Sequence, residues 1–307
     1  MMEKIRTGWL VTDGLTAIPN TRTFWHDLLD WFPNLIDKTG GNTPWAYLPI
    51  NVEREAQLAG NPDYIIRNCT YFRRLNLNVK TYSLLQDIKP NTQQIDVANH
   101  SDVVVCNTRF TYSHFKDMIK SRVEIIPLGV NSEIFTPQND QSQELGILPN
   151  SILFVGAANN YPKGFDLMLD IINKTNHNFC LVMKDGFSLN HPRVRVFNRV
   201  SQEKIAKIYN SCKMILCTSR TETQHLVGIE GGFCGIPTIA TNVGIYYNLE
   251  SGEWGRRANN LDEFKREIEY VFNNPNDFNT RDYFLREGYD VSTCKESWTK
   301  IINETDG

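Results

Sequence analysis

Short apolar runs alternate with amphipathic stretches along almost the whole chain. In the first half, the runs "TGWLV" and "SDVVVCNT" are followed by "TRTFWHDLLDWF" and "FTYSHFKDMI", which have the 3.6-residue apolar spacing of helices. Buried parallel strands read as continuous apolar runs, and each needs a crossover, usually a helix, before the next strand. The pattern therefore predicts an α/β protein built on parallel sheets.

The alternation is interrupted once, at residues 136–150, where Pro, Gln, Asn and Ser displace apolar residues. We interpret this stretch as a linker between a short Rossmann-like domain over residues 1–135 and a second one over residues 151–285. Residues 286–307 are expected to form a C-terminal helix, for which packing back on the N-terminal domain is one arrangement. Ligands of such sheets bind beyond the carboxyl ends of the strands, so residues that follow strands are the candidates for a site.

Composition narrows the class of protein. The 307 residues are 41% hydrophobic, which is enough for two buried cores, and the net charge of −3 argues against a nucleic-acid partner. The seven cysteines include no C-x-x-C pair, so we interpret them as reduced core residues. The polar N-terminus and the lack of a long apolar run favour a cytoplasmic protein. The amphipathic stretch from Phe24 leaves peripheral contact with the inner face of a membrane open.

A polar run from Ser219 to His225 directly follows the apolar run "KMILC". The helix expected from Leu226 therefore directs its first backbone N–H groups toward the ligand-binding edge of the sheet, where they attract an anion. Glu222 precedes this helix and Glu230 lies about one turn inside it, so both carboxylates can face one ligand. A phosphate flanked by two sugars would suit this arrangement. A pair of glutamates at this spacing is also typical of a solvated loop and helix surface.

The glutamate pair belongs to a longer resemblance. Residues 220–241 are similar to the E-x7-E region of family 4 retaining glycosyltransferases with the GT-B fold. Further similar blocks follow the order of that family, at residues 123–137, 152–169, 194–222 and 235–244. The resemblance implies two Rossmann-like doubly wound domains facing a central cleft. It also implies transfer of a sugar from a nucleotide-diphospho-sugar with retention of anomeric configuration.

The resemblance assigns roles to individual positions. Glu230 matches the glutamate that holds the ribose of the nucleotide, and Glu222 matches the one that contacts the donor sugar. Lys163 matches the lysine paired with the diphosphate, and Val200 falls where the backbone meets the base. Gly156 ends the first strand of this domain, where a side chain would crowd the phosphates. A UDP- or GDP-sugar is thus expected as substrate, with no separate cofactor.

The loop and helix start complete the expected donor site. Arg220 and His225 offer side chains that can contact a phosphate or a sugar hydroxyl, and Leu226 and Val227 offer backbone N–H groups. The chain contains no Asp-x-Asp motif, and its histidines lack the spacing of metal ligands, so no metal is expected. Lys163 and the helix amides are then the groups that stabilise the leaving diphosphate.

Several positions depart from the family pattern. Ala157 stands where an arginine is usual, so one phosphate contact is missing or supplied from elsewhere. Residues 223–225, "TQH", replace a Gly-Phe-Gly run and are expected to narrow the sugar pocket. In the N-terminal half, Asp87 aligns with the aspartate of a His-Asp pair near the reacting carbon, while Gln86 replaces the histidine. A role for Asp87 as a strand-end cap is the alternative.

These departures leave more than one function open. The main hypothesis is a retaining glycosyltransferase, of the hexosyltransferase kind, that acts on a glycan, a lipid-linked sugar or a protein. The alternatives are a non-catalytic protein that binds sugar nucleotides, and a GT-B epimerase or phosphorylase acting on sugar phosphates. Release of nucleoside diphosphate from the donor separates the binding protein from the enzymes.

Overall fold

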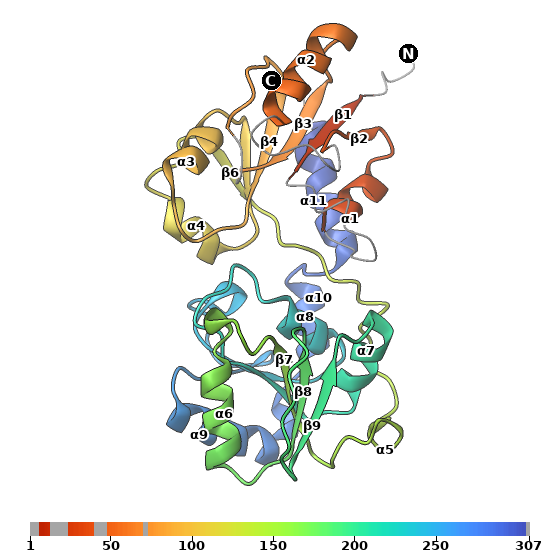
Figure 1. Ribbon diagram of the computed structural model, residues 1–307, viewed down its shortest axis with the longest axis vertical. Coiled ribbons are helices and arrows are strands. Elements are labelled where there is room, and N and C mark those ends of the chain that lie inside the picture. The colour runs from red at the N-terminus through yellow and green to blue at the C-terminus, as the bar shows by residue number, and fades with distance from the viewer. Residues whose placement is uncertain (1–5, 13–23, 40–47, 70–72, 305–307) are drawn as a thin grey trace. The chain divides into compact units, whose positions relative to one another are not determined.

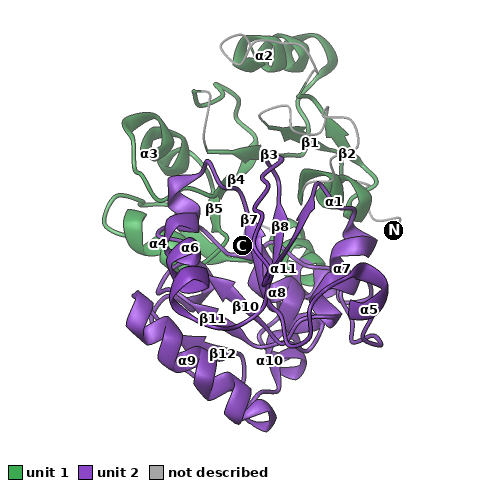
Figure 2. Ribbon diagram, turned by 60° about the horizontal axis from the view of Figure 1, so that its bottom comes forward, with its two compact units in different colours: residues 1–127, 295–307 green, residues 128–294 purple. Residues whose placement is uncertain are grey.

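The computed structural model describes residues 6–12, 24–39, 48–69 and 73–304 (Figure 1). The chain divides into two compact units (Figure 2). Unit 1 consists of residues 1–127 and 295–307, and unit 2 consists of residues 128–294. Among the helices that the structure describes, none combines the length and the apolar composition needed to cross a bilayer.

Unit 1 contains a parallel sheet with the strand order β2-β1-β3-β4-β5-β6. Its central strands are runs of buried apolar residues, as expected for a sheet covered on both faces. The strands are β1 (Gly8–Val11), β2 (Leu35–Asp37), β3 (Tyr64–Asn68), β4 (Lys80–Leu85), β5 (Val103–Cys106) and β6 (Arg122–Ile125). The helices are α1 (Phe24–Trp31), α2 (Leu48–Ala59), α3 (Thr92–Asn99) and α4 (Arg109–Phe115), together with most of α11 (Val291–Asn303).

Unit 2 contains a second parallel sheet, with the strand order β12-β11-β10-β7-β8-β9. The strands are β7 (Ile152–Gly156), β8 (Phe179–Met183), β9 (Val194–Asn198), β10 (Met214–Cys217), β11 (Thr238–Ala240) and β12 (Gly255–Arg257). The helices are α5 (Ser142–Leu145), α6 (Phe165–Lys174), α7 (Gln202–Asn210), α8 (Leu226–Phe233), α9 (Leu261–Asn273) and α10 (Thr280–Arg286). In both units the chain runs outward from a central strand in both directions, so each sheet is doubly wound as expected.

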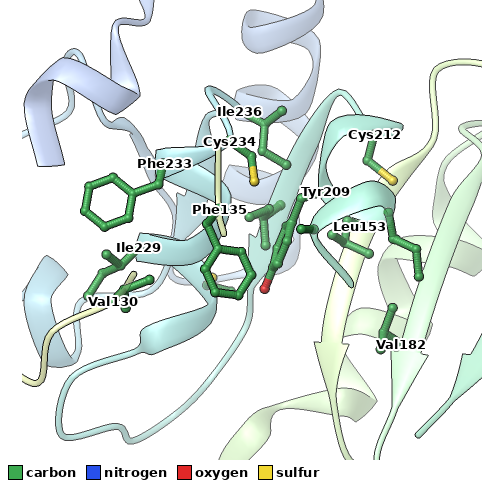
Figure 3. Close-up of a cluster of buried hydrophobic side chains, with 14 of the residues drawn as sticks. Val130, Phe135, Leu153, Val182, Tyr209, Cys212, Ile229, Phe233, Cys234 and Ile236 are labelled. Carbon is green, nitrogen blue, oxygen red and sulfur yellow. The ribbon is translucent and has the colours of Figure 1, made fainter. Parts of the chain in front are cut away.

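Two buried clusters form the core of unit 2, one on each face of its sheet. Successive strand residues point to opposite faces, so Leu153 joins the cluster under α7, α8 and α10, whereas Ile152 and Phe154 join the cluster under α6 and α9. Figure 3 shows the first cluster, in which Phe135 packs edge-on against Tyr209 with ring centroids 5.9 Å apart. This cluster lies directly beneath the helix that carries Glu230.

The division of the chain differs from the one expected. The units meet at Pro127–Leu128, and residues 136–150 are part of unit 2, where they include α5 and the buried side chain of Ile147. Polar composition alone suggested a linker, but one buried apolar residue within this stretch and Phe135 just before it hold it against the core of unit 2. Helix α11 begins in unit 2, and its residues from Lys295 onward belong to unit 1.

Contacts within unit 1 hold the end of α11. The hydroxyl of Tyr82 in β4 donates to the carbonyl of Ile301 over 2.9 Å, and the side chain of Trp298 is fully buried. The ring of Phe24 in α1 lies 6.1 Å from that of Trp298. Residues near the C-terminus thus complete the core of the N-terminal sheet.

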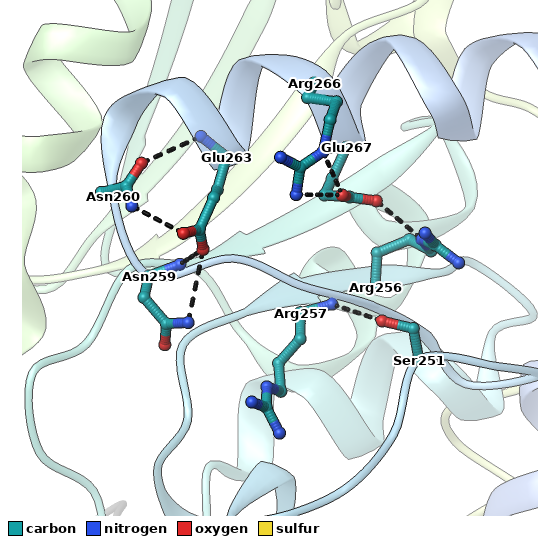
Figure 4. Close-up of polar contacts among 8 residues, drawn as sticks. All are labelled: Ser251, Arg256, Arg257, Asn259, Asn260, Glu263, Arg266 and Glu267. Carbon is teal, nitrogen blue, oxygen red and sulfur yellow. Dashed lines mark hydrogen bonds and ion pairs between the residues drawn. The ribbon is translucent and has the colours of Figure 1, made fainter.

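Polar contacts fix the position of α9 at the opposite edge of the unit 2 sheet from β9 (Figure 4). Asn260 caps the helix by accepting from the N–H of Glu263 over 3.0 Å. The buried carboxylate of Glu267 pairs with Arg256 of β12 over 2.7 Å and with Arg266 over 2.8 Å. The guanidinium groups of Arg256 and Arg266 offset the desolvation of the Glu267 carboxylate. The contact with Arg256 joins α9 to β12.

Candidate functional site

A pocket of about 460 Å³ lies in unit 2, beyond the carboxyl ends of its strands. Several of the residues singled out in the sequence meet here. The lining residues are Leu128, Phe135, Val155, Lys163, Val200, Gln202, Ile205, Glu222, Thr223, Gln224, His225, Leu226, Val227 and Glu230. Apolar residues of the core line one side of the pocket. Of its charged residues, Lys163 and Glu222 lie on the segments that follow β7 and β10, and Glu230 lies in α8.

Helix α8 presents its first turn to this pocket. The helix begins at Leu226 directly after the loop that follows β10, and ends before Gly235, which has the positive φ of +87° that favours glycine. Two glycines let the helix lie close to its neighbours. A Cβ atom would stand 1.9 Å from Ile215 at Gly231 and 2.2 Å from Phe284 at Gly232. Leu226 and Val227, the first two residues of α8, line the pocket, whereas the N–H of Gly228 donates to the carbonyl of His225 over 3.2 Å.

Lys163 and Glu222 form an ion pair in the pocket. Lys163 ends a short 3-10 turn after β7, and Gly164 lets this turn approach the loop after β10, because a Cβ atom there would stand 1.9 Å from the carbonyl oxygen of Thr218. The side chains of Lys163 and Glu222 keep 35% and 16% of their exposure. The ion pair of Lys163 and Glu222 is therefore accessible to solvent and to a ligand in the pocket.

Glu230 is held from below by a tyrosine. The hydroxyl of Tyr209 in α7 donates to Oε2 of Glu230 over 2.7 Å. Burial raises the pKa of Glu230, and the hydrogen bond from Tyr209 opposes that rise. Because a carboxylate can accept several hydrogen bonds, Glu230 retains acceptor capacity toward the pocket that it lines.

Gln224 forms a two-point contact that the sequence did not suggest. Its buried amide accepts from the N–H of Leu128 and donates to the carbonyl of Leu128, both over 2.7 Å. The two residues are 96 positions apart, so only the folded unit brings them together. Gln224 therefore fixes the loop before α8 to the segment that opens unit 2.

His225 is the residue that caps α8, and its backbone is unusual. It has φ +78° and ψ +61°, the left-handed conformation that non-glycine residues rarely adopt. The side chain is 7% exposed, and neither Nδ1 nor Nε2 has a hydrogen-bond partner among the described residues. Burial lowers the pKa of His225 to about 4, so the imidazole is neutral near pH 7.

Three expected site residues are not among those that line this pocket. Arg220 forms a two-point ion pair with Asp166 at the start of α6, with one contact of 2.7 Å, and lines a different pocket of about 480 Å³. Gly156 is not among the lining residues, and a side chain there would meet the ring of Phe154. Asp87 belongs to unit 1, where its carboxylate accepts from the N–H of Ile88 over 2.7 Å and from the side-chain amide of Gln94 over 2.8 Å.

Within the part of the chain that the structure describes, no group of three or more His, Cys, Asp and Glu residues is placed to hold a metal ion. All seven cysteines are buried and none forms a disulfide bond, as expected for core residues.

Two doubly wound parallel sheets, with a pocket at the strand ends of the second, define a GT-B-like class of protein. Comparison with known proteins makes the class more specific. Residues 149–274 match the family model described as glycosyl transferases group 1. An uncharacterized glycosyltransferase of Methanocaldococcus jannaschii is 28% identical over 217 residues, which are 66% of this chain and 58% of that protein. The chain spans about half the length of the curated relatives it matches.

Solved structures agree with this fold over nearly the whole chain. HepE of Anabaena in complex with UDP has a TM-score of 0.73 and 15% identity, covering 96% of this chain and 99% of that one. A sucrose-phosphate synthase of Thermosynechococcus elongatus has a TM-score of 0.75 and 13% identity, covering 97% and 98%. Similarity at this level of identity shows a shared fold, and the expected GT-B fold is thereby confirmed.

Proposed function

We propose that the protein is a glycosyltransferase that binds a nucleotide-diphospho-sugar in the pocket of unit 2 and transfers its sugar to an acceptor. The observation that carries this proposal is the Lys163–Glu222 ion pair beside Glu230 and the first turn of α8, all lining one pocket. The relatives that match this part of the chain are glycosyltransferases. HepE has also been solved with UDP-glucose, which makes that donor the first to test.

The Lys163–Glu222 ion pair takes part in donor binding by changing partners. An incoming diphosphate competes with Glu222 for the ammonium group of Lys163, and the N-terminus of α8 adds its own attraction for negative charge. Glu222, once released from Lys163, accepts hydrogen bonds from the donor sugar. Glu230, oriented by Tyr209, accepts from the ribose hydroxyls.

The same groups act in the transfer step. Negative charge builds on the diphosphate as it leaves, and Lys163 with the α8 amides stabilises that charge in a fixed geometry. Transfer is proposed to proceed with retention of configuration and without a divalent metal, from a UDP- or GDP-sugar.

The test begins with binding. Isothermal titration of the full chain with UDP, UDP-glucose and GDP-mannose measures donor preference, and release of UDP in the presence of EDTA measures turnover. Glu230→Gln is expected to weaken both UDP and UDP-glucose, because both carry the ribose. Glu222→Gln should spare UDP and weaken UDP-glucose alone. Equal effects of the two substitutions on UDP would contradict this division of roles.

Two outcomes would overturn the proposal itself. If the protein bound none of these nucleotides, the proposal that the pocket is a donor site would be wrong. Binding without release of nucleoside diphosphate, over a panel of sugar, lipid-linked and protein acceptors, would instead support the alternative of a non-catalytic protein that binds sugar nucleotides. Glu287→Gln is the matched control, because Glu287 is an exposed residue directly after α10, and it should behave as the parent does.

A further inference from the structure

The imidazole of His225 is a buried polar group whose hydrogen bonds are not satisfied by the protein. Both ring nitrogens lack a partner among the described residues, and the side chain is 7% exposed. Leaving a buried polar group unpaired costs roughly 1–3 kcal/mol. His225 also lines the donor pocket, so a ligand there can supply the missing partners.

The conformation of His225 points in the same direction. At φ +78° glycine would be unstrained, whereas a side chain at this position costs backbone energy. The ring nevertheless has a defined orientation, because it packs against Tyr246 with centroids 5.7 Å apart and an interplanar angle of 62°. The hydroxyl end of Tyr246 occupies the space where a side chain at Gly228 would stand, only 1.8 Å from the Cβ position. The strained backbone and the defined ring orientation of His225, at the N-terminus of α8, indicate that its side chain contacts the ligand.

The protonation state of the ring selects the kind of ligand group. A neutral imidazole has one N–H donor and one lone-pair acceptor. A diphosphate offers acceptors, so it can satisfy only the N–H. Sugar hydroxyls both donate and accept, so two of them, or one hydroxyl and a ring oxygen, can satisfy both nitrogens. Burial keeps the ring neutral, and Glu222 and Lys163 act on its pKa in opposite directions, which places the imidazole within electrostatic range of both.

We propose that His225 is a specificity-determining residue that binds hydroxyl groups of the transferred sugar, with one nitrogen donating and the other accepting. This inference rests on the proposed function, because it assumes a sugar nucleotide in the pocket. It assigns sugar recognition to a side chain at a position where the resembling family has glycine, and it assigns the diphosphate to Lys163 and the backbone of α8. The identity of the donor sugar then depends on His225 together with Glu222.

Two substitutions test the proposal without threatening the fold. His225→Gly removes the ring and relieves the backbone, whereas His225→Asn tolerates the left-handed conformation and keeps one donor and one acceptor. Asn150→Gly is the matched control, because Asn150 is an exposed residue of unit 2 with φ +54° and does not line the pocket. Circular dichroism confirms folding of all three variants.

The measurement is the dissociation constant of UDP, UDP-glucose and UDP-glucose analogues that each lack one hydroxyl. The parent is expected to bind at least one deoxy analogue about 5- to 100-fold more weakly than UDP-glucose, as the loss of a partner from a buried polar group implies. In His225→Gly this difference should shrink to within about threefold while the affinity for UDP is unchanged. His225→Asn should retain part of the discrimination.

The outcomes separate this inference from the proposed function. If His225→Gly weakened UDP as much as UDP-glucose, the ring would act on the nucleotide or on the structure of the loop, and the inference would be overturned. Full discrimination among deoxy analogues in His225→Gly would overturn it as well. If the parent bound no sugar nucleotide, among UDP-, GDP- and ADP-sugars, the proposed function would be overturned and this inference with it.

Discussion

The buried imidazole of His225 makes the stability of unit 2 depend on pH. Its pKa is lowered by burial from an ordinary value of 6.5 to about 4. In the unfolded chain, His225 is therefore protonated as the pH falls below about 6.5. In the folded chain it stays neutral until about pH 4. Acidification through this window favours the unfolded state, by on the order of 3 kcal/mol for this residue.

Between about pH 7 and about pH 4, we expect the free energy of unfolding to fall less steeply in His225→Asn than in the parent. Denaturant unfolding of the parent, of His225→Asn and of the control Asn150→Gly over this range measures the slopes. Glu222 and Lys163 lie within range of the ring and remain in every variant, so the difference between slopes belongs to His225. Equal slopes in the parent and His225→Asn would contradict the assignment.

Lys163 carries the charge stabilisation of the leaving group in the proposed mechanism. Loss of one such stabiliser from a preorganised site commonly reduces the rate by on the order of 10²–10³, and Lys163→Ala should fall by at least that factor. UDP release from UDP-glucose in EDTA is the measurement, and exposed Lys174→Ala in α6 is the control. A Lys163→Ala enzyme within a few-fold of the parent would refute this role, and loss of parent activity in EDTA would refute metal independence.

At the scale of single elements, the glycines of α8 determine how closely the helix approaches β10. An added Cβ atom at Gly231 would stand 1.9 Å from the side chain of Ile215, which is fully buried. Overpacking of this kind costs about 1–3 kcal/mol, so Gly231→Ala should lower the thermal stability of unit 2. Gly252→Ala is the control, since nothing lies within 4 Å of its Cβ position. Equal melting temperatures for the two variants would show that α8 can shift without cost.

Most elements of unit 2 could be predicted from the sequence, because local and tertiary signals agree there. The helix expected from Leu226 begins at that residue, directly after the polar run that follows β10. The stretch at 136–150 was misjudged because one buried residue, Ile147, outweighs its polar composition. A linker and a polar segment that lies over a core have the same composition.

The site could be predicted only in part. The resemblance pointed to Lys163, Glu222 and Glu230, and the structure brings all three to one pocket. The two-point contact of Gln224 with Leu128 depends on residues far apart in the chain, and nothing in the local pattern indicates it. For Arg220, the pairing with Asp166 is equally a product of tertiary structure, because α6 and the loop after β10 meet only in the folded unit.

At the scale of the whole molecule, helix α11 contributes buried residues to unit 1, although most of that unit is formed by residues 1–127. Trp298 is fully buried there, so Trp298→Ala should destabilise unit 1 by about 3–5 kcal/mol. Scanning calorimetry with and without UDP measures the effect, because UDP, in the proposed function, binds to residues of unit 2 and should raise the stability of that unit. The UDP-dependent shift should survive in Trp298→Ala and in the exposed control Glu296→Ala. Loss of the shift in Trp298→Ala would contradict a donor site confined to unit 2.

The passage of α11 from one unit to the other has a consequence for how the protein is made. Unit 2 is one continuous stretch of chain, residues 128–294, so a ribosome delivers all of it before residue 295 is added. Unit 1 is discontinuous, and its buried Trp298, Ile301 and Ile302 emerge only after the whole of unit 2. Domains generally fold as units once their chain is available. Unit 1 can therefore complete its fold only after all of unit 2 has been translated, although most of its residues precede unit 2 in the chain.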